Sequence, residues 1–227
     1  MGVIDLTGLI EEGMWLDNPH ILPPVIEHIA SVNGQIGWDA HRFTLSTIMG
    51  TYLEASAHLF LEGETIDQIL PERFICPAVL LQLPDCVPNQ AIHADDLRAV
   101  NVQLHAGDAA LIATGWERRW NKPEFVSESP YFTLDAMQWL LDAGSLIIGA
   151  DIPSFDNPVH PQGVVKLLFQ SGRLLLAPLV NLRLAGEQNI IKPILIALPL
   201  KIKGVCGAPC RAILVDSITI DAGLLNK

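Results

Sequence analysis

Short apolar runs of strand length constrain the fold of this chain more than any other feature of its sequence. They lie at 78–83, 109–113, 146–150, 194–200 and 212–215 of the 227 residues. Runs of four to eight mainly apolar residues are typical of strands that are buried on both faces. We therefore expect these segments to form the core of a sheet.

Two helices are expected between the later strands. Thr133 is a candidate N-cap for a helix that continues to about Ala143, and Gly144 is a stop signal directly after it. A second helix is expected over 164–170. Strands that alternate with helices predict an α/β architecture. Because the chain has no internal repeat and no long Pro/Gly/Ser linker, we expect a single domain over residues 1–227.

The composition narrows the possible partners. Half of the residues are hydrophobic and 17% are charged, which argues against disorder and favours an extensive apolar interior or subunit interface, such as that of a homodimer or homotetramer. The net charge of −11 opposes binding to nucleic acid, where phosphates must be neutralised. No apolar stretch approaches the roughly 20 residues of a membrane span, and the N-terminal region is acidic. We expect a cytoplasmic protein that binds neither nucleic acid nor membranes.

One segment of eleven residues carries a motif. From Ile48 to His58 it reads Ile-Met-Gly-Thr-Tyr-Leu-Glu-Ala-Ser-Ala-His. It resembles the signature His-x-Gly-Thr-His-x-Asp-x-Pro-x-His of the cyclase family, which includes bacterial kynurenine formamidases and isatin hydrolases. Segments 3–7, 107–116, 148–154 and 198–204 resemble other family segments in the same order. The resemblance implies a swivelling β/β/α-type fold with mixed sheets and flanking helices.

The resemblance also implies where the family binds its metal. Family members hold one or two divalent ions, usually zinc or manganese, on signature histidines and an aspartate, with a later histidine and glutamate. The corresponding residues in this chain are Ile48, Tyr52, Glu54, Val165 and Ala177. Of these only Glu54 is an ionisable oxygen donor, and aliphatic side chains cannot bind a metal. We therefore expect no metal and no other cofactor at the family's site.

A rearranged metal site is the alternative. Glu54 and His58 could be joined by His160, by His41, or by the pair at 206 and 210. The Cys-Gly-Ala-Pro-Cys spacing could chelate a metal, but one such pair lacks the four ligands of a structural zinc site. Two free thiols in a turn are the plainer interpretation. The four cysteines of the chain are also too sparse for a disulfide framework.

His58, Glu54 and Tyr52 are the candidate catalytic residues. The family histidine that corresponds to His58 lies beside the metal and is proposed to shuttle protons. Glu54 precedes His58 by four residues, which would place both side chains on one face of a helix and allow acid/base work. The Tyr52 phenol could donate a hydrogen bond to a carbonyl oxygen. The alternative is a remnant cleft in which His58 is only hydrogen-bonded, Glu54 is solvated and Tyr52 fills space.

The remaining candidates would bind substrate. They are Ile48, Val165 and Ala177 as apolar walls, Trp15 as an aromatic wall in a loop that resembles the family's substrate-proximal loop, and Asp151 and Ser154 as polar groups at a strand end. Apolar walls favour an aromatic or aliphatic ligand. For the last two residues, a structural turn is an equal alternative.

Two functions follow as hypotheses. The first is a divergent cyclase-family enzyme, of hydrolase or cyclase/lyase type, that acts on a small cyclic or aryl amide, formamide or lactone. Without a metal, proton transfer by side chains contributes only about 10²- to 10⁴-fold, which suits the less demanding cyclase or lyase reactions better than amide hydrolysis. The second is an inactive family member that binds a small hydrophobic or aromatic metabolite or serves as an assembly subunit.

Overall fold

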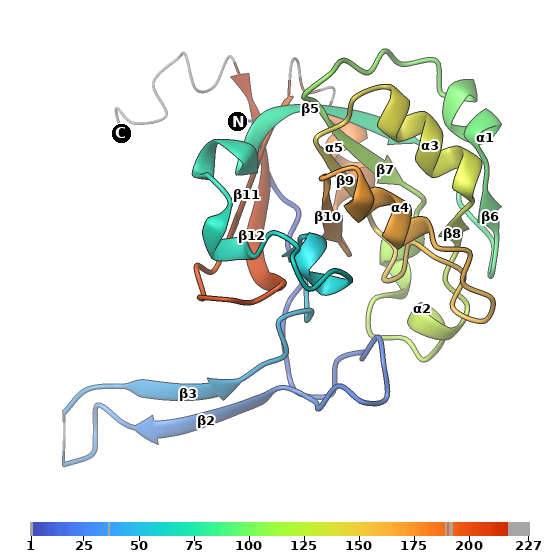
Figure 1. Ribbon diagram of the computed structural model, residues 1–227. Coiled ribbons are helices and arrows are strands. Elements are labelled where there is room, and N and C mark those ends of the chain that lie inside the picture. The colour runs from blue at the N-terminus through green and yellow to red at the C-terminus, as the bar shows by residue number, and fades with distance from the viewer. Residues whose placement is uncertain (1, 36, 189, 191–192, 218–227) are drawn as a thin grey trace.

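A computed structural model describes residues 2–35, 37–188, 190 and 193–217 (Figure 1). Its strands are β1 (Val3–Asp5), β2 (Val25–Ala30), β3 (Ala40–Thr44), β4 (Tyr52–Glu54), β5 (Ile75–Gln82), β6 (Ala91–Ile92), β7 (Ala109–Ala113), β8 (Tyr131–Phe132), β9 (Ile147–Ala150), β10 (Leu174–Ala177), β11 (Pro193–Pro199) and β12 (Gly207–Asp216). Its α-helices are α1 (Ala94–Ala99), α2 (Glu124–Ser127), α3 (Leu134–Asp142), α4 (Val164–Gln170) and α5 (Leu182–Glu187). Short 3-10 helices are η1 (Ser56–His58), η2 (Ile66–Gln68), η3 (Pro71–Phe74) and η4 (Trp116–Arg119).

Eight strands form one mixed sheet that closes on itself. Their order is β1-β12-β11-β5-β7-β9-β10-β4, and β4 also pairs with β12. The pairs among β5, β7, β9 and β10 are parallel, whereas β4 is antiparallel to both of its neighbours. Closure leaves β4 without a free edge, so both of its sides are fixed by neighbouring strands.

The closed sheet separates two hydrophobic cores. Alternate residues of β7 show the division, because Leu111 packs inside the barrel while Ala110 and Ile112 face the outer layer with α3 and α4. Every residue of β7, β9 and β10 is buried, as in parallel strands that are covered on both faces. Figure 1 shows α1, α3 and α4 gathered on one side of the barrel.

The elements expected from sequence patterns are present. Each of the five apolar runs overlaps a strand of the sheet, and the helices at 134–142 and 164–170 match the expected ones closely. Gly144 follows α3 with a left-handed φ of 82°, which suits a helix stop. Thr133 differs from the expectation. Its hydroxyl donates to the carbonyl of Ile92 and therefore makes no side-chain cap.

A two-stranded hairpin, β2–β3, extends away from the barrel (Figure 1). Its strands pair only with each other among the described residues, and most of their side chains are exposed. No helix within the described part of the chain combines the length and the apolar character that crossing a membrane would need.

Candidate functional site

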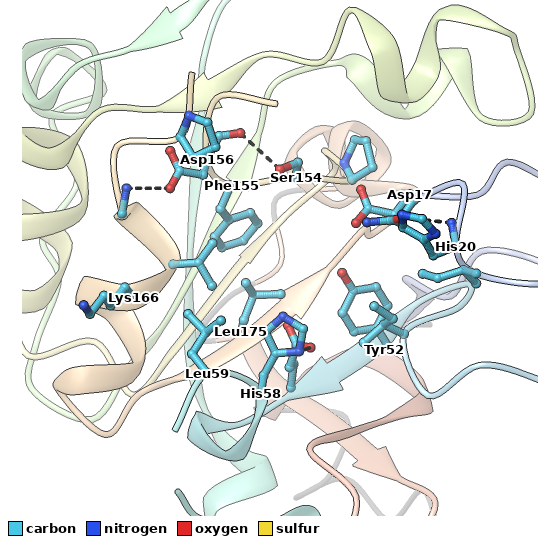
Figure 2. Close-up of a pocket in the computed structure, with 18 residues that line it drawn as sticks. Asp17, His20, Tyr52, His58, Leu59, Ser154, Phe155, Asp156, Lys166 and Leu175 are labelled. Atoms are coloured by element: carbon cyan, nitrogen blue, oxygen red, sulfur yellow. Dashed lines mark hydrogen bonds and ion pairs between the residues drawn. The ribbon is translucent and has the colours of Figure 1, made fainter. Parts of the chain in front are cut away.

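A cavity of about 520 Å³ lies between β4, the start of α4 and the N-terminal loop (Figure 2). Its polar lining residues are Asp17, Asn18, His20, Tyr52, Glu54, His58, Ser154, Asp156 and Lys166. Its apolar walls include Ile21, Ile48, Leu59, Phe155, Val165 and Leu175. The cavity thus combines apolar walls with ionisable groups that lie on a few short segments.

Strand β4 determines which of its side chains face the cavity. Side chains alternate along a strand, so Leu53 points into the barrel while Tyr52 and Glu54 point to the opposite face. Glu54 lies opposite Leu175 in β10 and opposite Gly207 in β12. The carboxylate is only 5% exposed and projects from a strand that is held on both sides.

The turn after β4 brings His58 back to Glu54. The spacing of four residues suggested a helix, but Glu54 ends a strand and His58 ends the 3-10 helix η1. His58 Nδ1 lies 2.7 Å from Glu54 Oε1 and 3.8 Å from the Sγ atom of Cys206. The edge of the Phe169 ring in α4 packs against the imidazole at 6.1 Å between ring centroids. The contact expected from sequence is therefore present, although a different local structure produces it.

Three groups in the cavity have altered acidity. The contacts with Cys206 and, second, with Glu54 raise the pKa of His58 to about 10. Burial, followed by the charge of Glu54, raises the pKa of Asp17 to about 6. Burial and the same two carboxylates hold the pKa of Tyr52 well above its ordinary value. At neutral pH the cavity thus holds a protonated imidazole, a largely ionised Asp17 carboxylate and a neutral phenol.

The loop before α4 forms a rigid part of the rim. Asp156 accepts hydrogen bonds from the backbone N–H groups of Gln162, Gly163 and Val164, at 2.7 to 2.9 Å. Ser154 donates its hydroxyl to the carbonyl oxygen of Asp156 at 3.1 Å. The side chains of Asp156 and Ser154 therefore hold the loop in place as well as lining the cavity.

Three of the predicted binding residues lie away from the cavity wall. Asp151 is fully buried and accepts hydrogen bonds from the backbone of Thr114 and Gly115 and from the Thr114 hydroxyl. Trp15 packs in an aromatic cluster, with its ring centroid 5.3 Å from that of Trp120. Ala177 is buried beside Tyr52 in the β10–β4 ladder. The other predicted residues all line the cavity, namely Ile48, Tyr52, Glu54, His58, Ser154 and Val165.

Sequence patterns did not reveal several lining residues. Asp17 and His20 come from the N-terminal loop, and Lys166 comes from the first turn of α4. Asp17 lies two residues after Trp15, the candidate aromatic wall, and this proximity is the only signal that the sequence offers for it. These residues lie at no characteristic spacing from the motif at 48–58. Only the folding of the chain brings them to the same cavity, so the sequence pattern did not reveal them.

Two groups of side chains among the described residues could hold a metal ion. One consists of Glu54, His58 and Cys206, and the other is the exposed cluster of His28, Asp39 and His41 on the β2–β3 hairpin. Cys210 lies within β12, four residues beyond Cys206, and is buried. Cys210 is not part of either group. His160 belongs to neither group.

Comparisons with known proteins agree on one relationship. Residues 4–157 match a family model described as "Putative cyclase". Kynurenine formamidase from Geobacillus thermodenitrificans (strain NG80-2) is 30% identical over 181 residues, which cover 76% of this chain and 78% of the relative. Isatin hydrolase from Roseibium aggregatum is 28% identical over 190 residues, covering 72% and 70%.

The solved structure of isatin hydrolase A from Ralstonia solanacearum superposes with a TM-score of 0.81. The match covers 93% of this chain and 90% of that one, at 24% identity. At this identity the likeness concerns the fold alone. It confirms the mixed α/β fold that the sequence resemblance implied.

Proposed function

The chain belongs to the cyclase family, and from this premise we propose that it is a hydrolase of small amides or esters that works in the cavity beside β4. The finer proposal is a cyclic or aryl amide, a formamide or a lactone as substrate. The observation that carries it is the convergence of Asp17, Tyr52, Glu54 and His58 on one cavity that also has apolar walls.

The substrate class rests on the relatives and on the cavity. Among the relatives are kynurenine formamidases, whose name indicates a formamide, and isatin hydrolase, whose name indicates a cyclic aryl amide. A cavity of about 520 Å³ falls within the range of roughly 300–1,000 Å³ that small-molecule sites occupy. Phe155 and Leu59 offer contacts for an aromatic ring, while the ionisable groups would face a carbonyl.

The family's metal ligands do not fit the residues of this chain. Ile48 and Val165 line the cavity with hydrocarbon, and Ala177 lies buried behind Tyr52. Burial keeps the Tyr52 phenol protonated, so it is a poor metal donor at neutral pH. Only Glu54 remains of the carboxylates and imidazoles on which metal catalysis depends. The proposed reaction therefore uses protein side chains alone.

We assign complementary roles to the ionisable groups. The Tyr52 hydroxyl would donate a hydrogen bond to the substrate carbonyl oxygen. Glu54 holds the ring of His58 through Nδ1, and Nε2 has no partner among the described residues and is left for the substrate. His58 would give a proton to the leaving atom, while the carboxylate of Asp17 would take one from the attacking water. Two groups whose acidities are shifted apart in one cavity are the usual pattern of an acid/base pair.

The test is turnover of formamides, cyclic aryl amides and lactones by chelator-treated protein. General acid/base groups contribute about 10²- to 10⁴-fold, so His58→Ala and Asp17→Asn should each lower kcat by roughly 10²-fold or more. Glu62→Gln is the matched control, because this carboxylate is exposed and lies outside the cavity. Wild-type turnover that survives both substitutions would contradict the assignment.

A second candidate is a binding protein without turnover. The observation that favours it is the hydrocarbon of Ile48, Val165 and Ala177 where the family resemblance places metal ligands. Such a protein would bind aromatic amides or acids in the cavity and release them unchanged. Tight binding without product formation, weakened by Val165→Asp, would support this candidate over the enzyme.

A further inference from the structure

We propose that Glu54, His58 and Cys206 form a relocated cation site for an ion of the zinc class. The three side chains supply one carboxylate oxygen, one imidazole nitrogen and one thiol sulfur, and their candidate ligand atoms all lie within 4.8 Å of one another. Mixed N, O and S ligands suit Zn²⁺, which is borderline soft, better than they suit Mg²⁺ or Ca²⁺. Cys206 has no counterpart in the signature motif, so this site differs from the one that the family resemblance implies.

The observed distances are close to those of a tetrahedral centre. With ligands at about 2.0 Å for nitrogen and oxygen and about 2.3 Å for sulfur, a tetrahedral ion separates N from O by about 3.3 Å and N from S by about 3.5 Å. The structure places His58 Nδ1 2.7 Å from Glu54 Oε1 and 3.8 Å from Cys206 Sγ. On binding, the N–O separation would widen by about 0.6 Å and the N–S separation would shorten by about 0.3 Å, within the reach of small rotations of the side chains.

The backbone holds the three ligands together without a metal. The N–H of Ala55 donates to the carbonyl of Cys206 at 2.8 Å, and Glu54 lies opposite Gly207 in the β4–β12 ladder. A side chain at Gly207 would place its Cβ 3.1 Å from the Leu53 carbonyl oxygen, so the two strands approach closely at this point. Ligands on paired strands need little ordering when an ion binds.

One oxygen of Glu54 provides a second observation. Glu54 Oε1 is buried and forms an ion pair with His58 Nδ1 at 2.7 Å, but no described residue donates it a hydrogen bond of good geometry. A buried carboxylate needs a positive charge nearby, and a bound ion would supply that charge in place of the imidazolium. Asp17 adds a further carboxylate to the same cavity. Three protein ligands would leave a fourth coordination position, as in catalytic rather than structural zinc sites.

The hairpin cluster of His28, Asp39 and His41 offers a competing site. Its three residues are exposed, and its histidine rings stack at 4.6 Å between centroids. None of its side chains is a buried group without a partner. Exposed histidines also bind zinc, however, so His28 and His41 must be replaced before zinc binding at the other site is measured.

The inference concerns binding and does not rest on turnover. An ion on His58 Nδ1 would take the place of the Nδ1 proton, and the ring would lose the positive charge that lets Nε2 act as an acid in the metal-free route. Activity that falls when zinc is added would agree with the cation site and with the route proposed above. Activity that requires zinc would support the site and overturn that route.

The experiment is a Zn²⁺ titration of chelator-treated full-length protein against a chromophoric chelator, followed by Co²⁺ substitution. We expect one tight site per chain in the His28→Ala/His41→Ala variant, with a near-ultraviolet band from thiolate-to-cobalt charge transfer. Cys206→Ser should abolish the band and weaken Zn²⁺ binding by roughly tenfold or more, since even supporting partners of a metal site are worth about 10- to 100-fold.

Two further variants keep the result interpretable. Cys86→Ser removes a half-buried thiol elsewhere and should leave both the band and the affinity unchanged. Glu54→Gln keeps the shape of the ligand and should weaken binding even if Cys206→Ser were to unfold the protein. The proposal is overturned if the hairpin double variant binds no tight zinc, or if the cobalt band persists in Cys206→Ser.

Discussion

Two aspartates illustrate how local surroundings assign different roles to the same side chain. Burial raises the pKa of Asp151, but three hydrogen bonds from Thr114 and Gly115 satisfy its carboxylate. Asp17 is partly buried without such donors, and its pKa is raised to about 6 beside Glu54. The first arrangement ties the ends of β7 and β9 together, and the second leaves a reactive group facing the cavity.

Asp151 therefore gives a prediction about stability. Asp151→Asn replaces one acceptor oxygen with an N–H donor that faces a backbone N–H, and leaving a buried donor unpaired costs about 1–3 kcal/mol. We expect a loss of that size in the free energy of unfolding, measured by urea denaturation. Asp95→Asn is the control, since its side chain is 92% exposed. If Asp151→Asn left the stability unchanged and raised KM, the result would instead indicate that Asp151 binds the substrate.

At the scale of elements, the turn after β4 decides where His58 lies. Residues 56–64 close on themselves: the N–H of Ala57 donates to the Glu64 carbonyl, and the Ser56 hydroxyl oxygen accepts from the N–H of Glu64. Gly63 lies against the backbone of this turn, where an added Cβ would be 2.4 Å from the Ala57 nitrogen. The imidazole is therefore placed by a backbone contact that tolerates only glycine.

Gly63→Ala tests this packing. Because the clash is with backbone rather than with a flexible side chain, η1 must shift, and overpacking of this kind costs about 1–3 kcal/mol. We expect that loss of stability, together with weaker binding of Zn²⁺ at Glu54 and His58. Gly34→Ala serves as the control, since its nearest contact is a carbonyl oxygen at 3.1 Å in an exposed turn. Wild-type stability in Gly63→Ala would show that the turn is looser than its geometry indicates.

At the scale of the whole molecule, the β2–β3 hairpin is the part that the barrel does not stabilise. Ile26 and Phe43 lie opposite each other on the two strands and are 41% and 60% exposed. Isolated two-stranded hairpins are marginally stable in water, so we expect another surface to cover the exposed apolar side chains of this one. A second copy of the chain is the partner that the apolar composition favours.

We accordingly predict a homodimer that depends on the hairpin. Light scattering during gel filtration should give twice the mass of one chain for the wild type and the mass of one chain for Ile26→Asp/Phe43→Asp, because burying two carboxylates in an apolar interface is costly. Leu61→Asp introduces a charge at a fully exposed position outside the hairpin and should remain dimeric. A monomeric wild type would contradict the prediction.

Local sequence patterns determined part of the secondary structure. Five strands of the sheet and the helices at 134–142 and 164–170 follow from runs of apolar residues and from turn residues such as Gly144, because these preferences act over a few neighbouring positions. The motif at 48–58 also placed Glu54 and His58 as neighbours, although it did so through an expected helical face, whereas the turn between β4 and η1 makes the contact. The family fold followed from the order of the motifs rather than from any one of them.

Only the tertiary structure decided the composition of the cavity and the contacts of its side chains. Cys206 meets His58 across 148 residues because β4 pairs with β12 to close the barrel. Asp17 reaches the same cavity from a loop without a recognisable pattern, and Asp151 leaves it because backbone donors of a neighbouring strand claim its carboxylate. Strand pairing and barrel closure depend on contacts between distant segments, and a local pattern carries no information about which distant side chains will meet.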